Sequence, residues 1–311
     1  MDPRILARMR CPVCGEPLAE TTAGTARALR CPRRHSFDIA RQGYVNLLAG
    51  RTPHTGDSAE MVAARSDFLA AGHYDTVAAA LAATAAEVVD RVRAVGPPAR
   101  FAATGAAPGD LRGDEAGRDG AYPLVVDAGA GTGWYLAAVL AARPDAVGLA
   151  LDVAKPALRR AARAHPRAAA ALADTWQRLP LADRSAAVLL NVFAPRNGAE
   201  FHRVLDPAGA LLVVTPAVDH LAELVDALDL LRVDPAKADR VAGSLGAHFT
   251  EESAMVHRAR LRLGRTEVAT LVGMGPSAWH ADPARLAERI AALPEPVPVT
   301  LAVRLAVHRP R

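Results

Sequence analysis

Three cysteines and one histidine near the start of the chain have the spacing of a closed metal site. Cys11-Pro-Val-Cys14 is a Cys-x-x-Cys knuckle, and Cys31-Pro-Arg-Arg-His35 is a Cys-x-x-x-His pair. The chain has 3 cysteines in all, and an odd number argues against a disulfide framework. A redox Cys-x-x-Cys motif is disfavoured because no strand–helix pattern surrounds the segment. A Cys3His set is typical of structural zinc. The predicted ligands are Cys11, Cys14, Cys31 and His35.

A glycine-rich loop follows a short apolar run further along the chain. Residues 125–133 read Val-Val-Asp-Ala-Gly-Ala-Gly-Thr-Gly. Glycines let a backbone pass close to a ligand, and this loop opens a predicted helix. A dinucleotide-binding G-x-G-x-x-G motif would need glycine at Trp134. The D-x-G-x-G-x-G pattern instead predicts an S-adenosylmethionine enzyme. The loop residues assigned to the cofactor are Asp127, Gly129, Gly131, Thr132 and Gly133.

Two further acids follow the next two predicted strands. Asp152 ends the second strand, where a carboxylate accepts hydrogen bonds from ribose hydroxyls. Asp174 comes just after the third strand, in a position suited to the adenine edge. Either acid alone could be a helix cap. Together with Asp127, at the ends of successive strands, they favour a site for S-adenosylmethionine.

The segment after the fourth predicted strand reads Asn-Val-Phe-Ala-Pro, residues 191–195. Ligands of doubly wound folds bind beyond the carboxyl ends of the strands. We therefore predict that Phe193 stacks on a target purine and that Asn191 orients its edge. The alternative is that Phe193 belongs to the core and Asn191 caps a turn. Asp57 is a further catalytic candidate, with an alternative role as a helix N-cap before Ser58.

An alternation of strands and helices must position these residues. Strands are expected at residues 124–128, 147–151, 169–173, 187–192 and 210–215. Helices are expected at residues 134–142, 155–164 and 200–205. Continuous apolar strands with helices between them predict a parallel sheet covered on both faces. Two long strands, 253–263 and 297–308, flank a helix at 283–293 and predict a closing antiparallel pair. The predicted fold is therefore an α/β class I (Rossmann-like) methyltransferase domain with an N-terminal zinc module.

Differences in composition along the chain indicate its domain boundaries. Residues 1–50 form the predicted zinc-binding, RNA-recognition module, and residues 51–95 a linker followed by a helical segment that breaks at Gly72. Residues 96–122 are rich in Gly, Ala, Pro, Asp and Arg and are expected to be a flexible insertion. Residues 123–311 form the methyltransferase domain. The module carries arginines suited to phosphate, unless they are only a solvated face. They are Arg27, Arg30, Arg33, Arg34 and Arg41.

The net charge and the hydropathy of the chain limit the classes of partner that it can have. The formal net charge of +4 suits a polyanion, although many ordinary enzymes are as basic. The N-terminus has no apolar signal region. The longest apolar run, residues 136–142, is too short to span a bilayer. A soluble, cytoplasmic protein without a membrane partner is expected.

Several segments together are distinctive of one family. Residues 31–48 read CPRRHSFDIARQGYVNLL, residues 56–61 GDSAEM and residues 71–74 AGHY. With RLPLAD at 178–183, the NVFAP segment and TPAVDHL at 215–221, the chain resembles the RlmA family of 23S ribosomal RNA guanine-N1 methyltransferases. The resemblance covers nearly the whole chain. Ala130 replaces a cysteine common in the family, and the 96–122 insertion is unusual.

The resemblance implies more than the motifs do. It implies that Tyr74 and His220 contact the cofactor, and that the enzyme is a homodimer with an RNA-binding cleft. It also implies methylation of guanine N1 in a domain II hairpin of 23S rRNA that lines the peptide exit tunnel. The NVFAP segment is similar in sequence to that of the Gram-positive branch of the family, which includes a tylosin-resistance methyltransferase of macrolide producers.

Two other functions are compatible with the cofactor loop. One is a small-molecule methyltransferase of natural-product biosynthesis, against which the zinc module and its arginines weigh. The other is a non-catalytic RNA-binding protein, against which the intact Asp127, glycine loop and Asp152 weigh. Activity on ribosomal RNA separates the first from the prediction, and cofactor binding separates the second.

Overall fold

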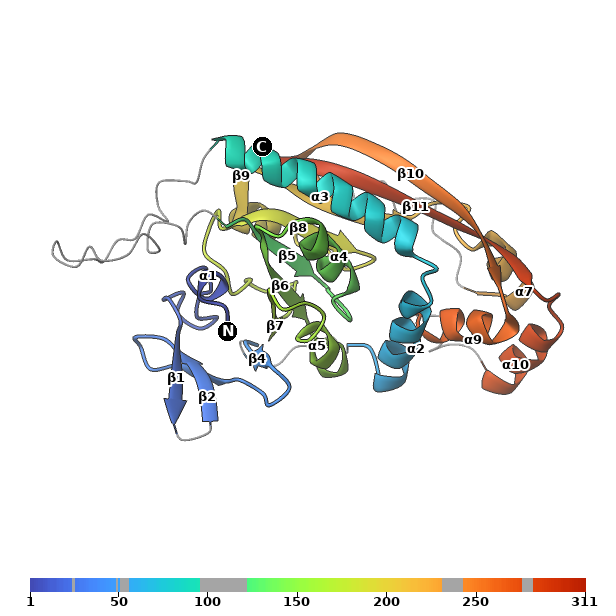
Figure 1. Cartoon of the computed structure of the whole chain (residues 1–311), viewed down its shortest axis with the longest axis horizontal. Coiled ribbons are helices and arrows are strands. Elements are labelled where there is room, and N and C mark those ends of the chain that lie inside the picture. The colour runs from blue at the N-terminus through green and yellow to red at the C-terminus, as the bar shows by residue number, and fades with distance from the viewer. Residues whose placement is uncertain (24–25, 49, 51–55, 96–121, 231–242, 276–281) are drawn as a thin grey trace.

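An eight-stranded sheet forms the centre of the computed structural model of the chain (Figure 1). The structure describes residues 1–23, 26–48, 50, 56–95, 122–230, 243–275 and 282–311. The parallel strands are β4 (Tyr44–Asn46), β5 (Leu124–Ala128), β6 (Val147–Asp152), β7 (Ala168–Leu172), β8 (Ala186–Val192) and β9 (Leu205–Pro216). Every residue of β5 and β8 is buried. Both faces of the sheet are therefore covered, as the continuous apolar runs predict.

Two long antiparallel strands complete the sheet. β10 (Phe249–Leu263) pairs with β11 (Val297–Pro310), and β11 pairs in turn with β9. The full order is β10-β11-β9-β8-β5-β6-β7-β4. Without β4, this is the order of the class I methyltransferase fold, in which the last strand inserts antiparallel next to the fifth parallel strand. The predicted fold class is confirmed, and both closing strands are longer than predicted.

The order of the strands reverses at β5. β6 and β7 follow β5 on one side of the sheet, whereas β8 and β9 lie on its other side. The connections after β5 and β8 therefore leave in opposite directions, and we call the region between them at the carboxyl ends of these strands the crevice. Such a switch point is where doubly wound folds bind ligands. The glycine loop and the NVFAP segment both begin there.

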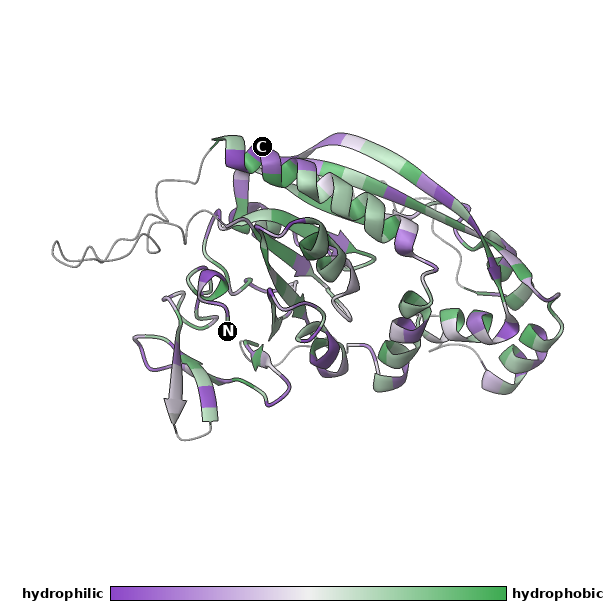
Figure 2. Ribbon diagram, in the orientation of Figure 1, coloured by the Kyte–Doolittle hydropathy of each residue, from purple (hydrophilic) through white to green (hydrophobic). Residues whose placement is uncertain are grey.

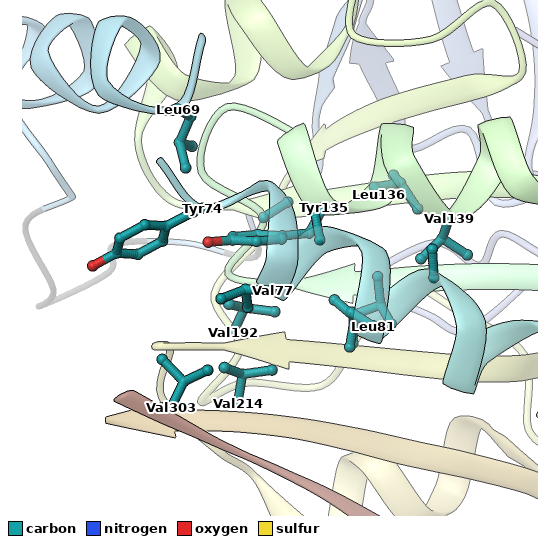
Figure 3. Close-up of a cluster of buried hydrophobic side chains, with 14 of the residues drawn as sticks. Leu69, Tyr74, Val77, Leu81, Tyr135, Leu136, Val139, Val192, Val214 and Val303 are labelled. Carbon is teal, nitrogen blue, oxygen red and sulfur yellow. The ribbon is translucent and has the colours of Figure 1, made fainter. Parts of the chain in front are cut away.

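Helices cover the two faces of the sheet and pack two separate cores. One face carries α3 (Asp75–Val95), α4 (Trp134–Ala142) and α5 (Lys155–Ala161), and the other carries α1 (Pro3–Leu6) and α6 (Gly198–Val204). Figure 3 shows Val77 and Leu81 of α3 packed among Leu136 and Val139 of α4 and Val214 of β9. The same cluster extends to the carboxyl ends of the strands, so this core supports the crevice.

A group of helices lies beyond that end of the sheet (Figure 1). It comprises α2 (Ala59–Ala70), α7 (Ala222–Leu228), α9 (Arg265–Gly273) and α10 (Pro283–Ala291). α2 packs against α9 and α5. The chain turns from α2 into α3 at Gly72, whose φ of 82° lies in the left-handed region that favours glycine. The predicted break of the helical segment at this glycine is confirmed.

The N-terminal segment is built differently from the rest. β1 (Ala19–Ala23), β2 (Ala26–Arg30) and β3 (Ser36–Asp38) form a small antiparallel sheet of their own. The next strand, β4, instead joins the main sheet beside β7, so the predicted module of residues 1–50 shares its last strand with the methyltransferase sheet. The sequence did not indicate this pairing. Of the predicted insertion at 96–122, all but Tyr122 lies outside the described residues.

Hydropathy follows this arrangement. Figure 2 shows the central strands mostly green, with purple toward the two ends of α3 and in bands along β10. Among the described residues, no helix has the length and apolar character needed to cross a bilayer.

Candidate functional site

The four predicted metal ligands lie together in the N-terminal module. Their ligand atoms all lie within 4.8 Å of one another. Sγ of Cys14 is 3.7 Å from Sγ of Cys31, and Nδ1 of His35 is 3.4 Å from Sγ of Cys31 and 3.6 Å from Sγ of Cys11. Tetrahedral zinc, with bonds of about 2.3 Å to sulfur and 2.0–2.1 Å to nitrogen, separates its ligands by roughly 3.5–3.8 Å. The residues fit zinc, and the predicted zinc module is confirmed.

Two tight turns aim these ligands. The N–H of Gly15 donates to the carbonyl of Cys11 at 2.8 Å, and Gly15 has a φ of 75°. The N–H of Arg34 donates to the carbonyl of Cys31 at 2.9 Å, and Arg34 has a φ of 68°. Each turn therefore directs the side chains before and after it to one point. A tetrahedral ion would use all four side chains, so the set fits a structural site with no open position for catalysis.

The glycine loop takes a conformation that few other residues could adopt. Gly129, Gly131 and Gly133 have φ values of 82°, 54° and 78°. A Cβ added at Gly129 would lie 2.4 Å from Cβ of Ala194, a clash with the segment after β8. Thr132 is buried within the loop. The loop is therefore held closely over the crevice between β5 and β8.

Asp152 fastens this loop to the next strand. Its Oδ2 accepts a hydrogen bond from the N–H of Gly131, and its Oδ1 accepts one from the N–H of Ala154, both at 2.8 Å. A carboxylate oxygen has a second lone pair, so both oxygens can still accept from a ribose. The buried Asp174 holds its own turn, because its Oδ1 accepts from the N–H of Trp176 at 2.9 Å.

Asp127 is the most unusual group of the site. Its side chain is buried, and neither carboxylate oxygen has a hydrogen-bond partner among the described residues. Burial, with the nearby charge of Asp152, raises the pKa of Asp127 to about 8. A buried carboxylate without a partner strongly favours a cation. The amino-acid end of S-adenosylmethionine carries an ammonium group, so the site fits this cofactor.

Three aromatic side chains line the crevice beyond β8. The hydroxyl of Tyr74 lies 3.4 Å from Nε2 of His220, and the N–H of Ala302 donates to Nδ1 of the same ring at 3.2 Å. Phe193 stacks on His220 with ring centroids 6.1 Å apart and an interplanar angle of 26°. Phe193 has a φ of 53° and is 42% exposed. The structure thus brings Tyr74, Phe193 and His220 into one cluster, and the core alternative for Phe193 is wrong.

The structure changes the interpretation of Asn191. Its side chain is fully buried, and its Nδ2 donates to the carbonyls of Ala128 at 3.2 Å and Pro195 at 2.8 Å. An amide engaged below the surface does not reach the edge of a base. Asn191 instead ties the NVFAP segment to the end of β5 and so positions Phe193.

One of the two predicted roles of Asp57 does not hold. Ser58 is the N-cap of α2, since its Oγ accepts from the N–H of Met61 at 3.2 Å. The N-cap role suggested for Asp57 is therefore wrong. Asp57 forms an ion pair with Arg65 of α2. Its carboxylate lies near enough to Asp152 to raise the pKa of that group further, after burial itself.

Sequence reasoning missed two members of the site. Tyr135, at the start of α4, is buried with its hydroxyl directed toward Tyr74 (Figure 3). Burial raises the pKa of Tyr135, and Tyr74 and Asp127 raise it further. Arg65 lies against the glycine loop, 3.5 Å from where a Cβ of Gly131 would be. Tyr135 and Arg65 lie in helices whose sequence pattern does not indicate a ligand. Their place in the site follows only from their proximity to the glycine loop in the folded structure.

The strand order, the glycine loop and the acids after β5, β6 and β7 define a class I S-adenosylmethionine-dependent methyltransferase. Comparison with known proteins narrows this class. Residues 9–52 match the model of the RlmA N-terminal zinc ribbon. The chain is 66% identical over 311 residues to a Micromonospora griseorubida protein named as a candidate 23S rRNA (guanine-N1)-methyltransferase, with 100% of both chains covered.

A second relative is the 23S rRNA (guanine(748)-N1)-methyltransferase of Streptomyces fradiae, which is 48% identical over 310 residues, 100% of this chain and 99% of that one. The chain belongs to this RlmA-type family of 23S rRNA (guanine-N1)-methyltransferases. The solved structure of the 16S rRNA methyltransferase KamB covers 61% of this chain and 89% of its own, at 17% identity and a TM-score of 0.36. That likeness plays no part in the assignment.

Loss of one zinc ligand should unfold the small sheet while the main sheet remains. Replacing Cys31→Ser is expected to weaken zinc affinity at least about 100-fold, because a structural site supplies folding energy to a segment with little core. Metal content by mass spectrometry and hydrogen exchange over β2 and β3 measure this. Ser36→Ala, an exposed change in the same module, is the control. Unchanged metal content in Cys31→Ser would contradict the assignment.

Replacing Asp127→Asn should stabilise the protein without cofactor above neutral pH. The pKa of Asp127 in the folded protein, about 8, exceeds the unfolded value of about 3.9. The folded state therefore retains a proton that the unfolded state has lost, and stability falls as pH rises from about 4 to 8. Asparagine removes this penalty, so the free energy of unfolding at pH 8 should rise by up to about 5 kcal/mol, with little change at pH 4.

Denaturant unfolding at the two pH values measures the effect of Asp127→Asn. The exposed Asp38→Asn is a control that should change neither value. A loss of stability at pH 8 in Asp127→Asn would mean that the carboxylate has a stabilising partner.

Proposed function

We propose that the protein transfers a methyl group from S-adenosylmethionine to N1 of a guanine in 23S ribosomal RNA. The proposed target lies in a domain II hairpin that lines the peptide exit tunnel, and its methylation would give macrolide resistance of the tylosin type. The observation that carries the proposal is a cofactor crevice with an exposed aromatic side chain, Phe193, on a chain that also carries a zinc ribbon. The full-length relatives named as rRNA guanine-N1 methyltransferases support the same substrate.

The residues of the crevice divide the work of binding. We assign the ammonium group of the cofactor to Asp127, the ribose to Asp152 and the adenine edge to Asp174, with the glycine loop enclosing the amino-acid end. S-adenosylmethionine supplies a methyl group that its sulfonium already activates. The task of the protein is then alignment and exclusion of water, which is mostly catalysis by proximity.

The aromatic cluster is suited to the base. Phe193 offers its exposed face for stacking on a purine that has left its helix. Nδ1 of His220 accepts a backbone hydrogen bond, so the proton of the neutral ring lies on Nε2 and is donated to the hydroxyl of Tyr74. Burial raises the pKa of Tyr74, so that hydroxyl keeps its proton as a donor. We propose that Tyr74 and His220 contact the cofactor, as the resemblance to the family implies, while Phe193 faces the base.

The zinc module supplies a surface for the RNA backbone. The five arginines noted in the sequence are all exposed, and Arg27 is held by Glu20 in an ion pair. Guanidinium groups bind phosphates in a planar, bidentate manner. Because β4 joins the module to β7, this surface has a fixed relation to the cofactor edge.

We also propose that the protein acts in the cytoplasm as a homodimer. β10 is the edge strand of the sheet, and it exposes Met255 and Val256, by 64% and 39%. An exposed edge with apolar side chains invites pairing with another chain. Light scattering tests this directly, and a mass near that of one 32.6 kDa chain at micromolar concentration would contradict it.

Mapping of reverse-transcriptase stops tests the proposed activity. The purified protein and S-adenosylmethionine should create one new stop on unmodified 23S rRNA, in the tunnel-lining hairpin, because an N1-methyl group blocks base pairing. Phe193→Ala should lower kcat/KM for RNA by about 5–150-fold, the value of one base–aromatic stack. Phe193→Tyr, which keeps the ring, is the control.

The two rival functions give different results in the same assay. Cofactor binding without any stop would favour a small-molecule substrate. Failure to bind S-adenosylmethionine would favour a non-catalytic RNA-binding protein. Either outcome would contradict the proposed reaction.

A further inference from the structure

Arg65 projects from α2 into the space between the glycine loop and the end of α9. Its Nη2 donates to the carbonyl of Met274 at 2.8 Å, and its Nη1 pairs with Asp57. Nη1 also lies 3.5 Å from the position that a Cβ of Gly131 would occupy. The guanidinium therefore lies against the loop that encloses the amino-acid end of the proposed cofactor.

Three carboxylates and one guanidinium lie around this loop. The carboxylates are Asp127, Asp152 and Asp57, and Arg65 is a cation that lies against the loop. Burial raises the pKa of Asp152, and Arg65 opposes that rise. The side chain of Arg65 is 28% exposed, so it is partly desolvated and still open to a ligand.

The cofactor carries one negative charge that the carboxylates of the site cannot bind. The amino-acid end of S-adenosylmethionine is a zwitterion, and its ammonium group is already assigned to Asp127. Its α-carboxylate requires a cation or N–H donors. A guanidinium has five N–H donors in a planar fork, and the hydrogen bonds of Arg65 to Asp57 and to the carbonyl of Met274 use only part of them.

We propose that Arg65 binds the α-carboxylate of the cofactor, held in place by Asp57 and by the carbonyl of Met274. This assignment rests on the proposed function, because it deepens the cofactor site. It gives Asp57 a positioning role: the carboxylate orients the guanidinium and does not accept a proton from the base. The crevice then offers one anion and one cation to the two charges of the amino-acid end.

Arg65 could instead have a purely structural role, in which it only joins α2 to α9. Truncation of the ligand separates the two roles, because S-adenosylhomocysteine has the α-carboxylate and 5′-methylthioadenosine lacks it. The test is calorimetric binding of both ligands to the full-length wild-type chain, to Arg65→Gln and to Arg65→Lys. Arg159→Gln, an exposed arginine of α5, is the matched control.

The expected result is selective. Arg65→Gln should weaken S-adenosylhomocysteine binding by about 10–100-fold, the range of a hydrogen bond to a charged group. Its affinity for 5′-methylthioadenosine should stay within about twofold of wild type. Arg65→Lys should lose less affinity for S-adenosylhomocysteine because it keeps the charge, and Arg159→Gln should match the wild type.

Two results would overturn the assignment. An equal loss of affinity for both ligands in Arg65→Gln and Arg65→Lys would show that Arg65 only supports the fold. No loss for either ligand would show that the carboxylate binds elsewhere. Failure of the wild-type chain to bind either ligand is a separate result, and it would remove the proposed function together with this inference.

Discussion

A buried carboxylate without a partner is the constraint on which the site depends. Asp127 is the penultimate residue of β5, inside a sheet covered on both faces, so water cannot solvate it. Such a charge is unfavourable unless a cation or several donors compensate it. Burial of the Asp127 carboxylate is unfavourable in the empty site, but the same burial strengthens its interaction with a cationic ligand. The doubly wound topology explains its location, because the crevice opens at this strand.

The surrounding residues shape the site next to that carboxylate for one kind of ligand. Asp152 holds the glycine loop at the distance of a hydrogen bond, and Asn191 holds the opposite wall by two backbone carbonyls. α2 then brings Arg65 against the loop. The zinc module is attached to the same sheet through its edge strand β4. In the proposed function, the cofactor site and the surface for RNA are therefore carried by one sheet.

Much of this architecture could be predicted from the sequence, for physical reasons. The buried parallel strands are continuous apolar runs in the sequence. The zinc ligands could be recognised because a structural zinc site needs a fixed set of donors at characteristic spacings. β4 was not predicted, because a strand of three residues has too little periodicity and becomes stable only by pairing with β7. Arg65 and Tyr135 escaped notice because their function arises from tertiary proximity. Asn191 was misjudged because sequence does not report the direction of a side chain.

The measurement that tests the account most directly is the number of protons released when S-adenosylhomocysteine binds at pH 7. Calorimetry in two buffers of different ionisation enthalpy gives this number. With a pKa of about 8, Asp127 is mostly protonated in the free protein at pH 7. Binding of the ligand's ammonium group should ionise it and release close to one proton, about 0.9. We expect this release in the wild type and its loss in Asp127→Asn. Tight binding with no proton release in the wild type would contradict it.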